Sequence, residues 1–207
     1  MSSVRSRHFN LERLQSLTDG IFAVAMTLLV LDIRIAPGFG RDTLAQGLVQ
    51  LVPRLYSYVT SFFVLALFWW IYHRLISVLT HADDGFVWWN VGFLFAVTLL
   101  PFSAYLLGAF YGTLIATEMY CLNLIVLSAL LIILWKHGER RELVGREVSG
   151  LQRKAITQRL VGMTVAYSCT ALIGFWFPIW FWLGFGIMIP VRILLRRAVP
   201  SVDRTHW

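Results

Sequence analysis

One apolar run near the N-terminus, Arg13–Leu31, carries a carboxylate and narrows the possible folds more than any other feature. The run reads RLQSLTDGIFAVAMTLLVL, so Asp19 stands at the mouth of a stretch long enough to cross a bilayer. An unpaired carboxylate at that depth is costly. The sequence therefore predicts a membrane helix whose neighbours supply a partner for Asp19.

A helix over this run has two different faces, because successive residues turn by about 100°. One stripe consists of Leu17, Val24, Thr27, Leu28 and Leu31, with Gly20 close to it. Asp19 lies more than a quarter-turn away, on a face that we expect to contact neighbouring helices. The stripe, apolar with a single hydroxyl, suits either the lining of a narrow path or a surface that faces lipid or another helix.

The same run must be distinguished from a signal peptide, in which Arg5 and Arg7 would precede an apolar core over Ile21–Leu31. Asp19 is unusual in such a segment, and no good small-x-small cleavage site follows. We therefore interpret the run as a retained helix.

The composition places the whole chain in a membrane. Of its 207 residues, 58% are hydrophobic and only 14% are charged, which is more apolar surface than a soluble domain of this size buries. Cys121 and Cys169 lie in apolar runs and indicate neither disulfides nor a metal site. The net charge of +7 is better explained by membrane topology and anionic headgroups than by nucleic acid. We expect one all-α membrane domain over residues 1–207.

Six transmembrane helices are predicted in each subunit. Their expected bounds are Leu14–Ile35, Arg54–Thr80, Val87–Phe110, Thr117–Trp135, Arg159–Phe175 and Pro178–Leu195. Residues 36–53 form an outer linker with a short helix, which Asp42 or Thr43 caps and Pro53 ends.

Charge sets the expected orientation. Residues 1–13, 136–158 and 196–207 hold most of the 18 Lys and Arg residues, and we place them in the cytoplasm as N-terminus, loop and tail. Three basic residues fall on the other side: Arg34, Arg41 and Arg54. The positive-inside rule thus favours six spans with both termini in the cytoplasm.

Polar residues gather in the second and third spans. Trp70 and His73 are three residues apart on one helical face, and Asn90 lies early in the third span. We interpret them as a buried hydrogen-bond cluster that holds the first three helices together. His73 is the first candidate partner of Asp19, because both lie toward the cytoplasmic side.

A metal site and a catalytic site have little support. His81 and Asp84 have an i,i+3 spacing that suits metal ligands, but no third ligand stands out. No Ser or Thr in the spans has a His–carboxylate context. We expect no metal, no cofactor and no enzymatic activity.

The stretch from Arg13 to Gly20, R-x-x-x-L-T-D-G, resembles the R-x-x-x-F-S-D-G signature that opens the first helix of the lysosomal/endosomal potassium channel family, in particular its prokaryotic homologues. The continuation IFAVAMTLLVLDIRI is also similar. Three further features follow in the same order: the Trp/His pattern that ends at His73, Asn90, and Pro101-Phe102. The resemblance covers about the first half of the chain by motif and the whole chain by span count.

This resemblance implies a homotetramer of six-span subunits around one pore. The first helix would line the pore with apolar rings, and potassium would be favoured over sodium. Carried onto this sequence, the pore and constriction positions are Val24, Thr27, Leu28 and Leu31. The inter-helix anchor positions are Arg13, Thr18, Asp19, His73, Trp70 and Asn90.

Four positions make this assignment less regular. Leu17 replaces Phe and Thr18 replaces Ser, so we expect the anchor to pack differently. Val24 is smaller than the Leu or Ile expected at the narrowest ring, which loosens the closure. The helical phase also carries Arg13 close to the stripe, where it would repel cations unless the helix bends near Gly20 or the side chain reaches sideways.

We expect a potassium-selective or weakly selective cation channel in a bacterial plasma membrane, with K⁺ as the permeant ion. Its partners would be further copies of the chain, membrane lipids and monovalent cations, but no nucleic acid. The alternative is a proton- or metal-coupled secondary transporter that titrates Asp19, His73 and His81. A third option is a membrane assembly protein without transport. In a carrier these polar residues face the transport path, whereas in such a channel they face away from it.

Overall fold

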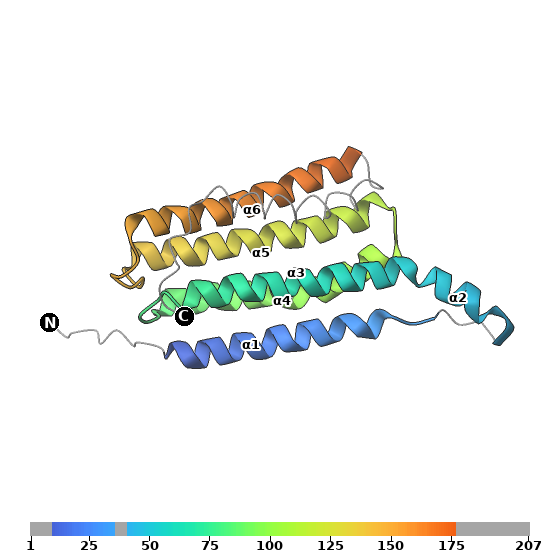
Figure 1. The fold of residues 1–207 in the computed structure, drawn as a ribbon, viewed down its shortest axis with the longest axis horizontal. Coiled ribbons are helices and arrows are strands. Elements are labelled where there is room, and N and C mark those ends of the chain that lie inside the picture. Colours follow the sequence, from blue (N-terminus) through green and yellow to red (C-terminus); the bar gives the residue numbers. More distant parts are fainter. Residues whose placement is uncertain (1–9, 36–40, 177–207) are drawn as a thin grey trace, which may run out of the picture.

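The structure is a computed structural model that describes residues 10–35 and 41–176, and these residues are almost entirely helical. The long helices run alongside one another (Figure 1). In chain order the elements are α1 (Leu11–Leu28), the 3-10 helices η1 (Leu29–Asp32) and η2 (Arg41–Thr43), α2 (Leu44–Gln50), α3 (Val52–Ile76), α4 (Asp84–Ala109), α5 (Leu114–Arg140) and α6 (Gly150–Trp176).

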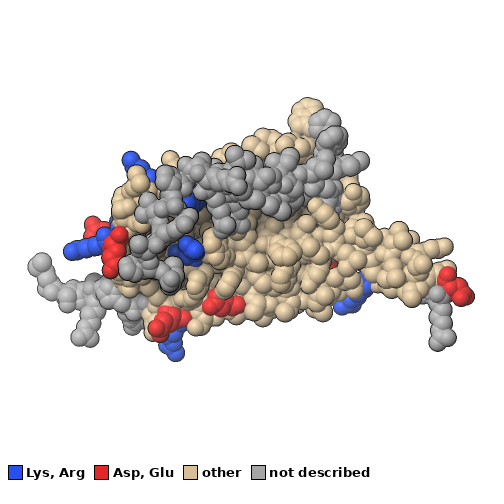
Figure 2. Space-filling model, in the orientation of Figure 1, with Lys and Arg blue, Asp and Glu red and all other residues tan. Residues whose placement is uncertain are grey.

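Five helices of the described part are long and apolar enough to cross a membrane: α1 with η1, α3, α4, α5 and α6. Charged side chains lie mainly at the two ends of the bundle, and uncharged residues cover most of its middle (Figure 2). The all-α membrane fold is thereby confirmed. The sixth predicted span, Pro178–Leu195, lies outside the described residues, as does the predicted tail over 196–207.

The polar cytoplasmic loop over residues 136–158, which we interpret from its sequence as a solvated helical extension, is largely helical. α5 continues to Arg140 and α6 begins at Gly150, so only residues 141–149 separate the two helices. Polar composition predicts exposure to water, and it does not prevent a helix from extending beyond the membrane. Ser149 and Gln152 also form a reciprocal cap at the start of α6, with bonds of 2.8 and 3.3 Å between side chain and backbone.

Helix starts follow local chemistry. Asn10 Oδ1 accepts a hydrogen bond from the Glu12 backbone N at 2.8 Å and so caps α1. Thr43 precedes α2 as expected, but without a side-chain capping bond. Pro53, predicted to end the short outer helix, instead lies in the first turn of α3, where a missing N–H costs nothing.

Helix α4 lies at the centre of the bundle. It packs against α1, α3 and α5, and α5 in turn packs against α6. Figure 1 shows α1 in blue and α6 in orange on opposite sides. The Phe93 ring of α4 lies 6.0 Å from Phe22 of α1 and stacks on Tyr72 of α3 at 5.4 Å. Because these packed rings occupy one side of α1, its other side stays open.

The α3–α4 and α5–α6 turns are joined at the end of the bundle where α1 begins, which we call the Leu11 end. Leu79 and Val144 form an isolated antiparallel bridge. Backbone hydrogen bonds of 2.9 Å flank it, from Thr80 N to Leu143 O and from Gly145 N to Val78 O. The two helical hairpins are therefore fixed to each other at this end.

Asp83 adds side-chain contacts to this junction. One carboxylate oxygen accepts from the Phe86 backbone N at 2.7 Å and caps α4, and His137 Nε2 lies 2.8 and 3.0 Å from the two oxygens. Burial acts to raise the pKa of Asp83. The hydrogen bonds from Phe86 and His137 and the charges of His137 and Arg141 outweigh burial, so the pKa lies below its usual value.

Asp83→Ala is expected to lower the free energy of unfolding by about 1–3 kcal/mol, because it removes both the α4 cap and the His137 contact. The folded-state pKa of Asp83 is depressed, so this contribution is present above the usual Asp pKa and is lost as the pH falls through the folded value. Thermal unfolding of the purified protein in detergent measures both effects. Asp84→Ala is the matched control, and an equal loss in the two variants would contradict this role of Asp83.

Candidate functional site

Helix α1 turns one face into the bundle and the other outward. The buried face consists of Leu14, Thr18, Phe22, Ala25 and Leu29. The stripe predicted from the helical period lies on the outward face, where Val24 is 58% exposed, Leu28 43% and Leu31 53%. Leu17 and Thr27 are exposed as well. The two faces predicted for this helix are thus present, and the described part of the subunit leaves the stripe open.

The outer part of the stripe contains two local features. Thr27 Oγ1 donates a hydrogen bond to the Val24 carbonyl at 2.8 Å. The hydroxyl proton is therefore engaged within the helix, and the lone pairs of the oxygen can still accept a donor or coordinate a cation. From Leu29 the chain tightens into η1, so Leu31 stands on a 3-10 turn and the α-helical phase does not place it. Leu31 nevertheless points outward, and the stripe therefore continues beyond the end of α1.

The partner of Asp19 is Trp69, and the prediction of His73 is wrong. Trp69 Nε1 donates to Asp19 Oδ1 at 2.7 Å, whereas His73 Nδ1 lies 2.9 Å from Gln15 Nε2. α1 and α3 run in opposite directions, so a step of four residues toward the C-terminus of α1 matches a step of four back along α3 (Figure 1). Gln15 therefore meets His73 and Asp19 meets Trp69, one helical turn from the expected residue.

A buried cluster lies beside this pair and joins three helices. The Thr18 hydroxyl donates to the Leu14 carbonyl at 3.0 Å and lies 3.1 Å from the Tyr72 hydroxyl. Asn90 Nδ2 of α4 donates to Thr18 Oγ1 at 3.4 Å. Thr18 and Asn90 were expected as anchors and are fully buried. Tyr72 was missed, although it stands in the same FWWIYH stretch as His73.

Two other predicted anchor residues, Trp70 and Arg13, differ from the expectation. The Trp70 ring lies under the Arg74 guanidinium at 4.8 Å, which is a contact within α3, and it is the neighbouring Trp69 that bonds to α1. Arg13 is exposed and makes no hydrogen bond or ion pair with the described residues, so the bond expected between Arg13 and Asp19 is not present there. Arg13 thus stays on the outward side of α1, near the line of the stripe.

The residues considered for a metal or a proton relay are not brought together. His81 Nδ1 lies 2.9 Å from Thr80 Oγ1, while Asp19 and His73 contact Trp69 and Gln15. No group of three His, Cys, Asp or Glu residues in the described ranges has a geometry that would hold a metal ion. Asp19 and His73 instead hold α1 to α3, and His81 contacts its neighbour in the α3–α4 turn.

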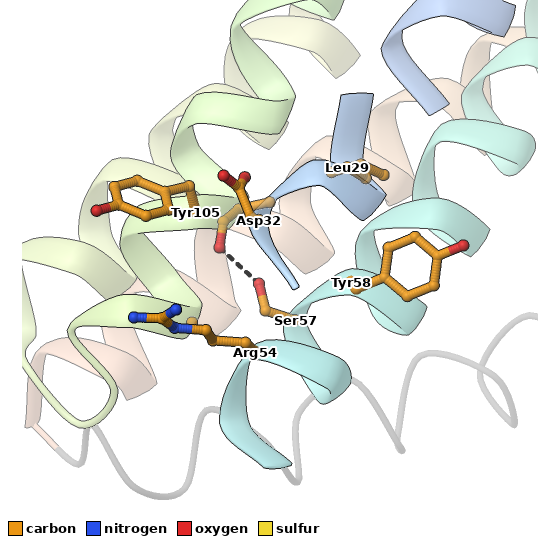
Figure 3. Close-up of a pocket in the computed structure, with 8 residues that line it drawn as sticks. Leu29, Asp32, Arg54, Ser57, Tyr58 and Tyr105 are labelled. Atoms are coloured by element: carbon orange, nitrogen blue, oxygen red, sulfur yellow. Dashed lines mark hydrogen bonds between the residues drawn. The ribbon is translucent and has the colours of Figure 1, made fainter. Parts of the chain in front are cut away.

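At the opposite end of the bundle, near α2, the segment that follows η1 is tied to α3. Arg54 Nη1 donates to the Arg34 carbonyl at 3.0 Å, and Ser57 Oγ of α3 donates to the Ala104 carbonyl of α4 at 2.6 Å. Figure 3 shows this second bond with Asp32 and Arg54 nearby. A Cβ added at Gly108 would lie 3.0 Å from the Arg54 Cα, so α3 and α4 approach closely here. The α1–η1 segment is therefore held at both ends.

Comparisons with known proteins agree with this architecture. Residues 13–101 match the model of the family described as endosomal/lysosomal potassium channel TMEM175. The chain is 27% identical over 190 residues to a potassium channel from Chamaesiphon minutus, which covers 89% of this chain and 93% of that protein. It is 28% identical over 132 residues to a potassium channel from Streptomyces collinus, covering 62% of this chain and 64% of that protein.

A relative and two solved structures extend these matches. The endosomal/lysosomal proton channel TMEM175 of Danio rerio is 22% identical over 138 residues, which are 66% of this chain and 26% of that protein. The crystal structure of a lysosomal potassium-selective channel TMEM175 homolog from Chamaesiphon minutus matches with a TM-score of 0.71 and 26% identity, over 92% of this chain and 98% of that one. A variant of the potassium channel MtTMEM175 shares the fold, with a TM-score of 0.63 at 13% identity over 96% of both chains.

The family suggested by the R-x-x-x-L-T-D-G stretch is thereby confirmed, and the matched region begins at the arginine of that stretch. The likeness to the Chamaesiphon minutus protein extends over most of the chain in both sequence and structure. Residues 13–101 of this chain are homologous to the endosomal/lysosomal potassium channel TMEM175 family.

Proposed function

We propose that the chain is a potassium-conducting channel whose path runs along the outward face of α1. The observation that carries this proposal is the exposed stripe on a helix that is held firmly by its opposite face. Val24 and Leu31 are more than half exposed, while the residues one-half turn away are buried. Two bacterial relatives are named as potassium channels, which supports the same function.

A path along the outside of one subunit needs other copies to enclose it. Fourfold cyclic symmetry around the stripe makes one ring of four identical side chains from each of its residues. Gly20 fits such an arrangement, since a Cβ there would meet nothing within 4 Å inside the subunit and its absence lets neighbouring backbones approach. We therefore propose a homotetramer in a bacterial plasma membrane, with both termini in the cytoplasm, as the positive-inside rule favours.

Apolar rings control conduction by excluding water when the path is narrow. Val24, Leu28 and Leu31 would supply these rings, and Thr27 would offer an oxygen to a partly dehydrated cation. Ion passage makes and breaks no covalent bond, so the proposal assigns no catalytic group and no cofactor beyond the permeant K⁺. The bonds of Asp19 to Trp69 and of His73 to Gln15 hold α1 to α3, which disfavours the carrier alternative.

Electrical recording of the purified protein in planar bilayers tests the function. A channel gives unitary currents that reverse near the potassium equilibrium potential in asymmetric KCl and NaCl. A coupled carrier instead gives no unitary events and shows a fixed ratio between potassium and proton movement. That second result would overturn the proposal.

The native mass of the protein in mild detergent is expected to correspond to four chains of 23.7 kDa each, plus bound detergent and lipid. The exposed stripe of one chain can enclose a central path only when the stripes of other copies face it, and we propose four copies. Native mass spectrometry measures it directly. A stable monomer or dimer that still conducts would contradict a path enclosed by four copies of α1.

Thr27→Val should lower the preference for potassium over sodium without disturbing the fold, because the two side chains have nearly the same shape and only the oxygen is lost. The hydroxyl proton is already bonded to the Val24 carbonyl, so the effect is on the lone pairs that face outward. The reversal potential under bi-ionic conditions measures the change. Thr60→Val on α3, whose hydroxyl bonds to its own helix in the same way, is the control and should leave selectivity unchanged.

A further inference from the structure

A second site lies at the Leu11 end of the bundle, away from the stripe, in a cavity of about 340 Å³ between the end of α5 and the start of α6. Lys136 and Glu139 line it from α5, and Arg153, Lys154, Thr157 and Gln158 line it from α6. Figure 2 shows Lys and Arg side chains exposed at this end of the molecule. Three cations and one carboxylate therefore share one open cavity.

The single carboxylate does not neutralise the cavity. Glu139 is already bonded to Lys136, with 2.7 Å between Oε2 and Nζ. Arg153 is held by two neutral acceptors, the carbonyl oxygens of Val148 and Gly145, each at 3.3 Å. These bonds fix the guanidinium without cancelling its charge. Lys154 is exposed and has no ion pair with the described residues. The cavity thus keeps an excess of two positive charges.

The polar lining of the cavity is rigid. Thr157 Oγ1 accepts a hydrogen bond from Trp135 Nε1 at 2.9 Å and donates to the Arg153 carbonyl at 3.0 Å. Trp135 is fully buried, and its bond to Thr157 joins α5 to α6 at a residue that lines the cavity. The reciprocal cap of Ser149 and Gln152 already occupies the start of α6. The side chains of the cavity, rather than the end of the helix, are therefore what a ligand would meet.

The depth of the cavity decides what ligand can reach it. The apolar part of α5 ends just before Lys136, and α6 has no charged residue from Leu160 to Trp176. The cavity consequently opens where the hydrocarbon region gives way to the headgroup layer. Basic pockets between membrane helices at that level suit phosphate-bearing groups, because both the charge and the acyl chains of a lipid are accommodated there.

We propose that this cavity binds the phosphate of an anionic phospholipid headgroup, through Arg153 and Lys154 with Lys136 beside them. Thr157 and Gln158 supply the polar lining of the same cavity. The lipid would link the ends of α5 and α6 and so stabilise the half of the subunit that lies farthest from α1. A soluble phosphate compound has the same anionic group but no acyl chains to hold it at the membrane surface.

The test is lipid binding to the whole purified chain, measured by native mass spectrometry with added phosphatidylglycerol. Lys154→Gln should weaken binding by about fivefold, because each basic residue near a membrane surface contributes about that factor. Arg153→Gln should do the same, and Arg153→Lys should retain most of the binding. Arg146→Gln is the matched control, since it removes an exposed charge from the same turn but does not line the cavity.

Three comparisons decide the outcome. Phosphatidylcholine should bind more weakly than phosphatidylglycerol, since its headgroup has no net charge. Equal weakening by Lys154→Gln and Arg146→Gln would overturn the proposal in favour of diffuse surface charge. Competition by glycerol phosphate at the same concentration as the lipid would overturn the lipid as the source of the phosphate. Binding is read without ion flux, so a failure here is separate from any failure of the proposed channel.

Discussion

Val24→Ser should raise potassium flux by roughly tenfold and weaken the preference for potassium over sodium. A Ser ring holds water where a Val ring excludes it, and a barrier lowered by about 1.4 kcal/mol gives that factor. Leu31→Ser should act in the same direction, because its side chain is exposed to a similar degree on the same face. Flux into liposomes with a potassium-sensitive dye gives the rate, and bi-ionic reversal potentials give the selectivity.

The matched control for this experiment is Val59→Ser on α3. Val59 is 47% exposed and Val24 is 58% exposed, so the same chemical change is made at a similar surface position away from α1. Its flux should equal that of the parent protein. If Val24→Ser and Leu31→Ser also conduct like the parent, the stripe does not line the path and the exposed face of α1 must contact lipid.

The two faces of α1 could be predicted from the sequence because they depend on one number, the helical period. The predicted stripe residues Val24, Leu28 and Leu31 lie on the exposed face, and Leu14 and Phe22 are buried on the other. The period holds only within an α-helix, however. The change to a 3-10 helix at Leu29 has no clear sequence signal. Leu31 faces outward as predicted, but the α-helical period on which that prediction rested does not apply to it.

Contacts between helices were harder to predict, because they depend on the register of one helix against another. Asp19 and His73 lie at similar depths, but a sliding of α3 by one turn makes Trp69 the partner instead. The hydrophobic pattern of each helix is the same in both registers, so it cannot predict which register the two helices adopt. The contact between Asp83 and His137, which are 54 residues apart, likewise depends on how two turns meet at the Leu11 end.

The family resemblance supplied what the period could not. It identified Thr18 and Asn90 as anchors, and the structure places both in one buried cluster with Tyr72. It named Trp70, whereas the observed bond to α1 comes from the neighbouring Trp69. A motif transfers the kind of residue and its approximate position, but an error of one residue turns a helix by about 100° and changes the partner.

Asp19→Ala should impair assembly of the proposed tetramer rather than tune its ion preference. The substitution removes the acceptor for the Trp69 indole N–H, and we expect a loss of about 1–3 kcal/mol in the contact between α1 and α3. Asp19→Asn should be milder, because its amide oxygen still accepts that hydrogen bond. Trp69→Phe should resemble Asp19→Ala, since it leaves the carboxylate without its donor. Size-exclusion chromatography and flux, measured on the same preparations, separate assembly from conduction.

Pairing the two substitutions identifies the contact itself. If Asp19 and Trp69 act through their 2.7 Å hydrogen bond, the double variant should lose less than the sum of the single variants, because one bond cannot be removed twice. Trp70→Phe is the matched control: it changes the adjacent indole, whose ring lies under Arg74, and it should leave the effect of Asp19→Ala unaltered. A well-assembled Asp19→Ala tetramer with a changed ion preference would place the carboxylate in the permeation path, and the division of α1 into an anchored face and a conducting face would then be wrong.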